Sequence, residues 1–164
     1  MSPAMEDTKV SIRERQEEFH ANILAACRRN ETIASLKVDL VFFIMLRGRH
    51  FYLVVFNLKK PSFLIIDNIN HTQSIEEVYG IVPETLHSLF CNYLREVHHP
   101  KAYEMLQLQP EIVDMDWRTK KNFVDCGVFA MRHMETFFGS KSKDWKCGLV
   151  KEGTKNKAQF NFIR

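Results

Sequence analysis

The sequence has no hydrophobic stretch long enough to cross a membrane as a helix. Its longest apolar run extends from Leu40 to Leu46, whereas a membrane-spanning helix needs ~20 apolar residues. The N-terminal segment is polar and lacks the charged-then-apolar order of a signal peptide. We therefore expect a soluble protein without a membrane partner, located in the nucleus or the cytoplasm.

Cysteine is scarce, and its spacing argues against the common metal and disulfide frameworks. The four cysteines are Cys27, Cys91, Cys126 and Cys147, and no C-x-x-C pair occurs among them. Cys27 and Cys91 lie in amphipathic helical patterns and are expected in the core, whereas Cys147 is expected to be structural. We expect free thiols, no metal ion and no organic cofactor.

Glycine and proline are also few, with six and five residues, and no repeat or low-complexity tract is evident. The chain has 164 residues, of which 45% are hydrophobic and 12% aromatic, which is enough to bury one core. We expect a single domain over residues 10–164, preceded by a disordered tail, residues 1–9.

Charge is unevenly distributed although the formal net charge is only +3. The stretch from Ser140 to Arg164 holds seven basic residues and two acidic ones. Such a stretch can be a solvated face, a surface for an acidic partner, or a nucleic acid contact. Because no base-reading motif or aromatic platform accompanies the lysines, nucleic acid is the least favoured of the three.

One cysteine occupies a position where a thiolate is favoured. Asp125 is a good helix N-cap, so we expect a helix to begin at Cys126. Its N-terminal N–H groups would then stabilise negative charge on the sulfur, and the Cys126 N–H could donate to a developing oxyanion. Gly127 would leave room for a substrate. The apolar residues expected on the buried face of this helix are Phe129, Ala130, Met134, Phe137 and Phe138. The alternative is that Cys126 only fills an apolar helix end.

A histidine and an aspartate are predicted to meet at one edge of a sheet. The segment Val38–Asp67 contains three β-rich runs separated by two polar turns, which predicts an antiparallel meander. His50 begins the second run and Asp67 ends the third, so antiparallel pairing brings both to the same edge. A nucleophilic cysteine needs a base and a group that orients the base, and His50 and Asp67 could supply these. Alternatively, both are ordinary turn residues.

Three further segments have helical or strand patterns. Val10–Arg29, with Ile12, Phe19, Ile23 and Leu24 as apolar positions, and Pro83–Val97 are predicted as amphipathic helices. Glu111–Trp117 is predicted as a short strand that leads into the loop Arg118–Val124, which would deliver Cys126.

Together these motifs resemble the ubiquitin-like protease (SUMO or sentrin protease) family. The order His, Asp, Cys is shared, with HFYLVVFNLKKPSFLIIDN before the cysteine and NFVDCGVFAMRHME around it, closest to the plant-type members. The likeness runs from Val38 to Arg164. It implies an α+β fold, in which a mixed sheet is flanked by helices and the nucleophile starts a central helix. It also implies Cys126 as nucleophile, His50 as general base and Asp67 as its orienting acid.

The sequence departs from the family pattern around the expected substrate site. Lys120 stands where relatives carry a glutamine that helps to form the oxyanion hole, and Asn122 matches an asparagine that is usual in the family. Phe51 stands where SUMO proteases have a tryptophan that clamps the glycine tail of the substrate, and no tryptophan precedes His50. Relatives also normally continue beyond the final FNFIR, so the chain is expected to be either a shortened copy or a fragment of the domain.

The resemblance implies a cysteine peptidase or isopeptidase, acting as a monomer, that cleaves after the C-terminal glycine of a ubiquitin-like modifier, with SUMO the favoured one. Two alternatives remain open. An inactive or weak relative could bind the modifier without turnover, and an acyltransferase could use the same His, Asp, Cys order. No acyl-coenzyme or inositol phosphate pocket is evident in the sequence.

Overall fold

The fold is built around a β-meander that runs from β1 to β3. In the computed structural model, β1 (Leu40–Arg47), β2 (His50–Asn57) and β3 (Ser62–Ile66) pair in antiparallel fashion. A two-residue turn joins β1 to β2, and its Gly48 has φ 59°, a conformation that favours glycine. The structure describes residues 10–27, 38–120, 122–149 and 151–152.

A fourth strand makes the sheet mixed. β4 (Pro110–Ile112) pairs with β3 in parallel, so the strand order is β1-β2-β3-β4. The sheet and its flanking helices therefore confirm the α+β class expected from the resemblance. The predicted strand Glu111–Trp117 was too long, because the paired strand ends at Ile112 and only Val113 adds a further backbone hydrogen bond, to Ile65.

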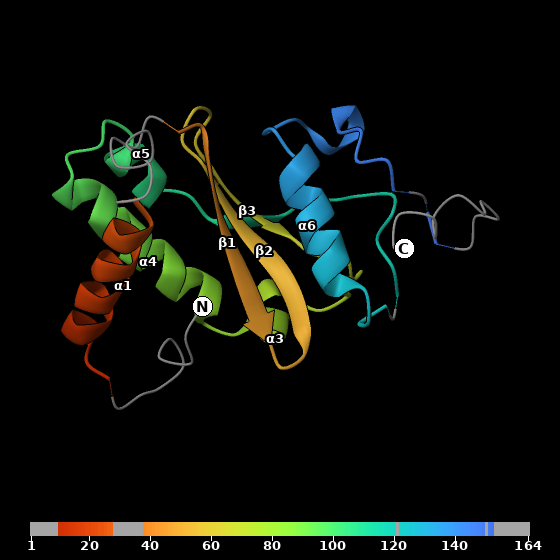
Figure 1. The fold of residues 1–164 in the computed structure, drawn as a ribbon, viewed down its shortest axis with the longest axis horizontal. Coiled ribbons are helices and arrows are strands. Elements are labelled where there is room, and N and C mark those ends of the chain that lie inside the picture. Colours follow the sequence, from red (N-terminus) through yellow and green to blue (C-terminus); the bar gives the residue numbers. More distant parts are fainter. Residues whose placement is uncertain (1–9, 28–37, 121, 150, 153–164) are drawn as a thin grey trace.

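Helices cover both faces of the sheet, as Figure 1 shows. On one face lie α1 (Ile12–Cys27) and α4 (Val82–Glu96), and on the other lies α6 (Cys126–Thr136). The short helices α3 (Ile75–Tyr79) and α5 (Ala102–Leu106) flank α4 in sequence, and a 3₁₀ turn, η2 (Ser142–Asp144), follows α6. Among the described residues, no helix is long and apolar enough to span a bilayer.

Alternation along β2 divides the hydrophobic core into two clusters. Tyr52, Val54 and Phe56 point toward α4, where they meet a cluster that includes Phe90 and Leu94. Leu53 and Val55 point to the α6 side, where the buried cluster consists of Leu53, Val55, Ile66, Met115, Trp117, Ala130, Phe137, Trp145 and Cys147. A strand whose two faces are both buried must be apolar at nearly every position, which explains the run HFYLVVF.

Some predicted helix positions were wrong. Ile12 is 81% exposed and Leu24 is also exposed, so the buried stripe of α1 is narrower than expected and centres on Phe19. In α6, Phe137 caps the helix and is buried, but Phe138 is 78% exposed, because the chain leaves the helical path after Thr136. Residues 1–9 and the side chain of Cys27 lie outside the described part.

Candidate active site

His50 and Asp67 form a hydrogen-bonded pair at the end of the meander. Leu53 pairs with Ile66, so the following residue, Asp67, comes to lie opposite Tyr52, on the same face of the sheet as His50. The side chains meet directly, with His50 Nε2 at 2.8 Å from Asp67 Oδ1, and both residues are buried. The structure therefore brings together the two residues that the meander predicted to be neighbours.

Asp67 receives more donors than His50 alone. Its Oδ1 also accepts from the Ile69 N–H at 2.8 Å, and its Oδ2 accepts from Tyr79 Oη at 2.8 Å and lies 3.3 Å from His71 Nε2. Burial raises the pKa of Asp67, but the bonds from His50, Ile69 and Tyr79 more than offset this, and the pKa lies below its usual value. Asp67 is thus a carboxylate at neutral pH.

An ionised Asp67 fixes the tautomer of His50. A carboxylate can only accept hydrogen bonds, so Nε2 carries a proton and donates a hydrogen bond to Asp67 Oδ1. The other ring nitrogen, Nδ1, is buried and has no hydrogen-bond partner among the described residues. An imidazole nitrogen in this state can take up a proton from a thiol that comes within hydrogen-bond reach of it.

Cys126 lies against the backbone on either side of His50. Its Sγ accepts from the Phe51 N–H at 3.3 Å and is 3.8 Å from the Arg49 carbonyl oxygen. Within the imidazole of His50, Nδ1 is the nitrogen nearer to the backbone, and it makes no hydrogen bond to Sγ. The Phe51 N–H is free for this contact because β3 pairing ends at Leu53 and Ile66.

The His50 side chain and the body of α6 lie on opposite faces of the sheet. By strand alternation His50 and Asp67 share the face that carries α4, whereas α6 packs on the opposite face. Cys126 is the first residue of α6, so only the helix terminus meets the sheet edge. The predicted start of this helix is confirmed. Its first intrahelical bond runs from Phe129 N to Asp125 O, which leaves the N–H groups of Cys126 and Gly127 outside the helical ladder.

The side chain of Asp125 does not cap α6 as expected. No capping bond from its carboxylate occurs; instead Asp125 Oδ2 accepts from Asn122 Nδ2 at 3.0 Å, and Asp125 N donates to Asn122 Oδ1 at 3.1 Å. Both ends of the Asn122 amide are therefore used within the loop. Lys120 is exposed, and its backbone N–H donates to Glu152.

The loop before Cys126 is tied to the segment after Asp67. Asn68 Nδ2 donates to the Asn122 carbonyl at 3.0 Å and lies 3.4 Å from Thr119 Oγ1. The backbones join as well, with Thr119 N bonded to Asn68 O and Asn70 N bonded to Thr119 O. These bonds set the nucleophile loop relative to the acid that orients His50.

The other described cysteines lack these surroundings. Burial raises the pKa of Cys91 to about 11, and it also raises the pKa of Cys147. Both thiols are fully buried and stay protonated at neutral pH, so they suit core packing. His133 is buried too, and burial lowers its pKa to about 4, so its neutral Nε2 accepts from Trp117 Nε1.

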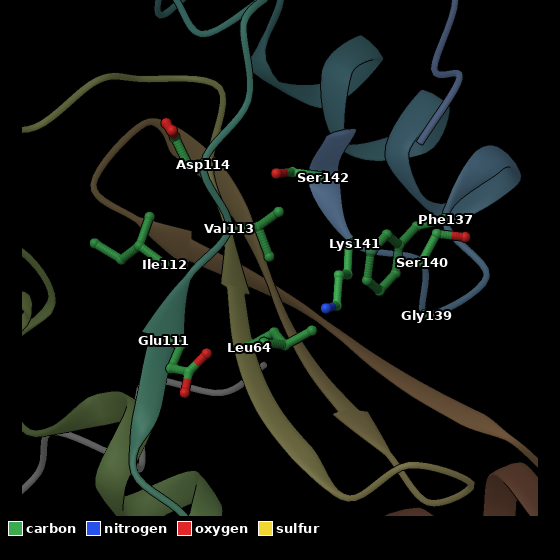
Figure 2. A pocket seen from close by; sticks show the side chains of 10 residues that line it. All are labelled: Leu64, Glu111, Ile112, Val113, Asp114, Phe137, Gly139, Ser140, Lys141 and Ser142. Carbon is green, nitrogen blue, oxygen red and sulfur yellow. The ribbon is translucent and has the colours of Figure 1, made fainter. Parts of the chain in front are cut away.

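Away from these residues, a cavity of about 330 Å³ opens between the β3–β4 edge and the segment after α6 (Figure 2). Leu64, Glu111 and Lys141 are among its lining residues, and His50, Asp67 and Cys126 are not. Within the part of the chain that the structure describes, no group of three or more His, Cys, Asp or Glu side chains could hold a metal ion.

Of the seven site residues predicted from the sequence, the structure pairs His50 with Asp67, and Phe51 with Cys126. The first pair is joined by a side-chain hydrogen bond, and the Cys126 sulfur contacts the backbone of Arg49 and Phe51. The sequence analysis missed Tyr79 and His71, the other two side chains that contact the Asp67 carboxylate. Both follow Asp67 closely in the chain, which could have suggested them as its partners.

Comparison with known proteins yields one family match. The model of the Ulp1 protease family, C-terminal catalytic domain, matches residues 3–158, nearly the whole chain. None of the curated proteins matches the sequence.

Proposed function

The chain belongs to the Ulp1 protease family of cysteine proteases, and we propose that it cleaves after the C-terminal glycine of SUMO, with Cys126 as nucleophile. The observation that carries this proposal is the His50 ring, held by Asp67 through Nε2 and left with an unpartnered Nδ1, while the Cys126 sulfur contacts the backbone of Arg49 and Phe51 on either side of His50. This is the arrangement of base and orienting acid that a cysteine nucleophile requires.

In the first half of the reaction, His50 Nδ1 takes the Cys126 proton and the thiolate attacks the glycine carbonyl carbon. A sulfur–carbon bond forms and the carbonyl oxygen becomes an oxyanion, which the Cys126 N–H at the start of α6 stabilises. His50 then gives its proton to the leaving amine nitrogen. The carbon–nitrogen bond breaks and an acyl-enzyme remains.

In the second half, water attacks the acyl carbon while His50 Nδ1 accepts a proton from it. The carbon–sulfur bond breaks, the modifier leaves with a free carboxylate, and the thiol is restored. Asp67 stays a carboxylate throughout and stabilises the imidazolium that forms twice in the cycle.

Neither Asn122 nor Lys120 is well placed to be a side-chain donor to the oxyanion, for different reasons. The Asn122 amide is already bonded to Asp125, so we assign it to holding the loop. Lys120 is exposed, and a flexible ammonium there would orient poorly toward an oxyanion. We propose that the Cys126 and Gly127 N–H groups supply most of the stabilisation.

The weak supply of side-chain donors favours a second candidate, a modifier-binding protein with little turnover. Modifier-specific probes separate the two. Purified protein is treated with vinyl sulfone derivatives of SUMO, NEDD8 and ubiquitin, and adducts are mapped by mass spectrometry. We expect a SUMO adduct on Cys126 that disappears in His50→Ala. SUMO binding without an adduct would favour the binding protein, and labelling by NEDD8 or ubiquitin alone would contradict SUMO as the modifier.

We also propose that the protein acts as a monomer in the nucleus or the cytoplasm, where conjugates of such modifiers occur. Light scattering at micromolar concentration tests the first point, and localisation of a tagged chain tests the second. A stable dimer or a secreted product would contradict these assignments.

A further inference from the structure

The two oxygens of the Asp67 carboxylate have separate partners. Oδ1 meets His50 Nε2 and the Ile69 N–H, both at 2.8 Å. Oδ2 accepts from Tyr79 Oη at 2.8 Å and lies 3.3 Å from His71 Nε2. Each oxygen therefore has two donors, and the two on Oδ2 are both side chains. We call Tyr79 and His71 the Oδ2 clamp.

Both residues of the Oδ2 clamp come from outside the meander. His71 lies in the loop after β3, and Tyr79 is the last residue of α3. A capping box fixes the start of this short helix, because the Glu77 N–H donates to Ser74 Oγ and the Ser74 N–H donates to the Glu77 carboxylate. Gly80 follows with φ 61°, a conformation that favours glycine and ends the helix. The helix thus has defined ends and places the Tyr79 hydroxyl at Oδ2.

Ring packing holds the Tyr79 side chain in place. Its ring packs against that of Tyr52, with centroids 4.7 Å apart, and the His71 ring meets it edge to face at 5.8 Å. Tyr52 lies two residues after His50 on the same face of β2. Tyr79 is buried, and only 16% of the His71 side chain is exposed. The hydroxyl therefore has little freedom to leave the carboxylate.

Tyr79 is a neutral donor to Asp67 at any pH at which the site works. Burial raises the pKa of its hydroxyl, and the charge of Asp67 and their hydrogen bond raise it further. The positive charge of Arg118 acts in the opposite direction but more weakly. His71 is the second donor, because a carboxylate can only accept hydrogen bonds and the His71 Nε2 must then carry a proton.

Without the Oδ2 clamp, the carboxylate would be held on one side only. The torsion that turns an aspartate carboxylate is soft, and a buried oxygen that lacks a donor is unfavourable. Loss of the Tyr79 hydroxyl therefore favours a rotation of the carboxylate that takes Oδ1 away from His50. The imidazolium formed during the reaction would then lose the charge that stabilises it.

We propose that Tyr79 and His71 are positioning residues, which hold Oδ2 of Asp67 so that Oδ1 stays on His50. This rests on the proposed function, in which His50 takes the Cys126 proton. Both residues act through Asp67. Because its contact is the shorter one, Tyr79 contributes more than His71.

Tyr79→Phe tests the proposal without any protein substrate, because it keeps the ring and removes only the hydroxyl. Alkylation of Cys126 by iodoacetamide is followed from mildly acidic to mildly basic pH, on protein shown to be folded by circular dichroism. A less stabilised imidazolium disfavours the thiolate, so the rate profile should move to higher pH, by about one unit for each tenfold loss of that stabilisation. A residue that only stabilised the fold would leave the profile in place. Tyr103→Phe is the matched control, since Tyr103 is 78% exposed, and its profile should match the wild type.

Two results would overturn the proposal. A folded Tyr79→Phe with the wild-type profile would show that the hydroxyl does not position the base. A profile that moves to lower pH would show that Asp67 keeps its place and only becomes a stronger base. His71→Ala should move the profile in the same direction by a smaller amount. It decides the matter if Tyr79→Phe does not fold, since a wild-type profile in His71→Ala would then contradict the proposal.

Turnover of a SUMO aminomethylcoumarin substrate gives a second readout. A displacement of about 1 Å can cost about 10²-fold in rate, so we expect Tyr79→Phe to lower kcat by about 10–10²-fold with little change in KM. If no modifier probe labels Cys126 but the alkylation profile still depends on Tyr79, the proposed function fails and the positioning role stands. If SUMO labels Cys126 while Tyr79→Phe changes neither the profile nor kcat, the proposed function stands and the positioning role fails.

Discussion

Asn122 and Asp125 hydrogen-bond each other twice across the turn that precedes the nucleophile. Asn122 Nδ2 donates to Asp125 Oδ2 at 3.0 Å, and Asp125 N donates to Asn122 Oδ1 at 3.1 Å. Because the amide is used at both ends, Asn122 positions Cys126 by shaping the loop, and the carboxylate of Asp125 serves the loop instead of capping α6.

This relationship predicts coupled effects of substitution. Asn122→Ala and Asp125→Ala should each lower kcat and slow alkylation of Cys126, and the double variant should be no worse than the more damaged single one. We expect a coupling free energy of about 0.5–3 kcal/mol in unfolding, as for residues in contact. Urea unfolding and alkylation kinetics of the four proteins provide the test. If Asn122→Ala reduced kcat alone, with normal stability and alkylation, Asn122 would be an oxyanion donor after all.

Removing the charge from the orienting acid should abolish most activity. Asp67→Asn leaves an amide that can hold the wrong His50 tautomer, and such a change costs roughly 10⁴ in kcat in a comparable triad. SUMO affinity should stay near normal, as measured by calorimetry.

Asn68→Ala provides the comparison. Asn68 reaches the nucleophile loop but not His50, so its loss should lower kcat by less than Asp67→Asn does. Equal losses in the two variants, or a loss confined to Asn68→Ala, would reassign the orienting group.

Tyr79 should stabilise the fold in a pH-dependent way. Its hydroxyl donates to Asp67 Oδ2, and a hydrogen bond to a charged group contributes about 1.5–3 kcal/mol. The pKa of Asp67 is lowered by folding, so this stabilisation is present above the unfolded-state pKa of about 3.9 and is lost as pH falls through the still lower folded-state pKa.

We therefore expect Tyr79→Phe to reduce the free energy of unfolding at pH 7, with a difference from wild type that shrinks below about pH 4. Tyr103→Phe is the matched control, because Tyr103 is 78% exposed. Urea titrations at several pH values measure both variants. A Tyr79→Phe effect that does not change with pH over the whole acidic range in which the wild type stays folded would show that the bond does not act on a carboxylate.

Lys120→Gln tests the oxyanion account. One donor to the oxyanion is worth roughly 10²–10³ in kcat, and a neutral amide at position 120 can be held more firmly than an exposed ammonium. We expect kcat to rise several-fold with little change in SUMO affinity. A fall in kcat would mean that the lysine has a catalytic role of its own.

The sequence predicted the local features of the site better than the long-range ones. His50 and Asp67 could be placed because a meander with short turns fixes the register between neighbouring strands. The start of α6 could be placed because helical apolar spacing is a local pattern and Asp125 does stand at the N-cap position, although its side chain makes no capping bond. The bond from Tyr79 could not, since it depends on how α3 docks against the end of β3.

Competition between groups explains the other misses. The Asp125 carboxylate was expected to cap the N-terminus of α6, but it accepts a hydrogen bond from the Asn122 side-chain amide instead. Phe138 was expected in the core, but the helix ends at Thr136 and Phe137 fills the space near Trp145. The extent of β4 could not be predicted, because its parallel pairing with β3 joins segments far apart in the chain and no local pattern reports it.

Competitive alkylation of the cysteines tests most directly whether this site activates Cys126. Folded protein is treated with limiting iodoacetamide at neutral pH, and modification at each cysteine is followed by mass spectrometry. Cys126 is nearly as buried as Cys91 and Cys147, so a difference in rate would report thiolate character more than access. We predict that Cys126 reacts well before both, and that His50→Ala removes most of its advantage. Equal rates at Cys126, Cys91 and Cys147 would contradict the assignment of Cys126 as the nucleophile.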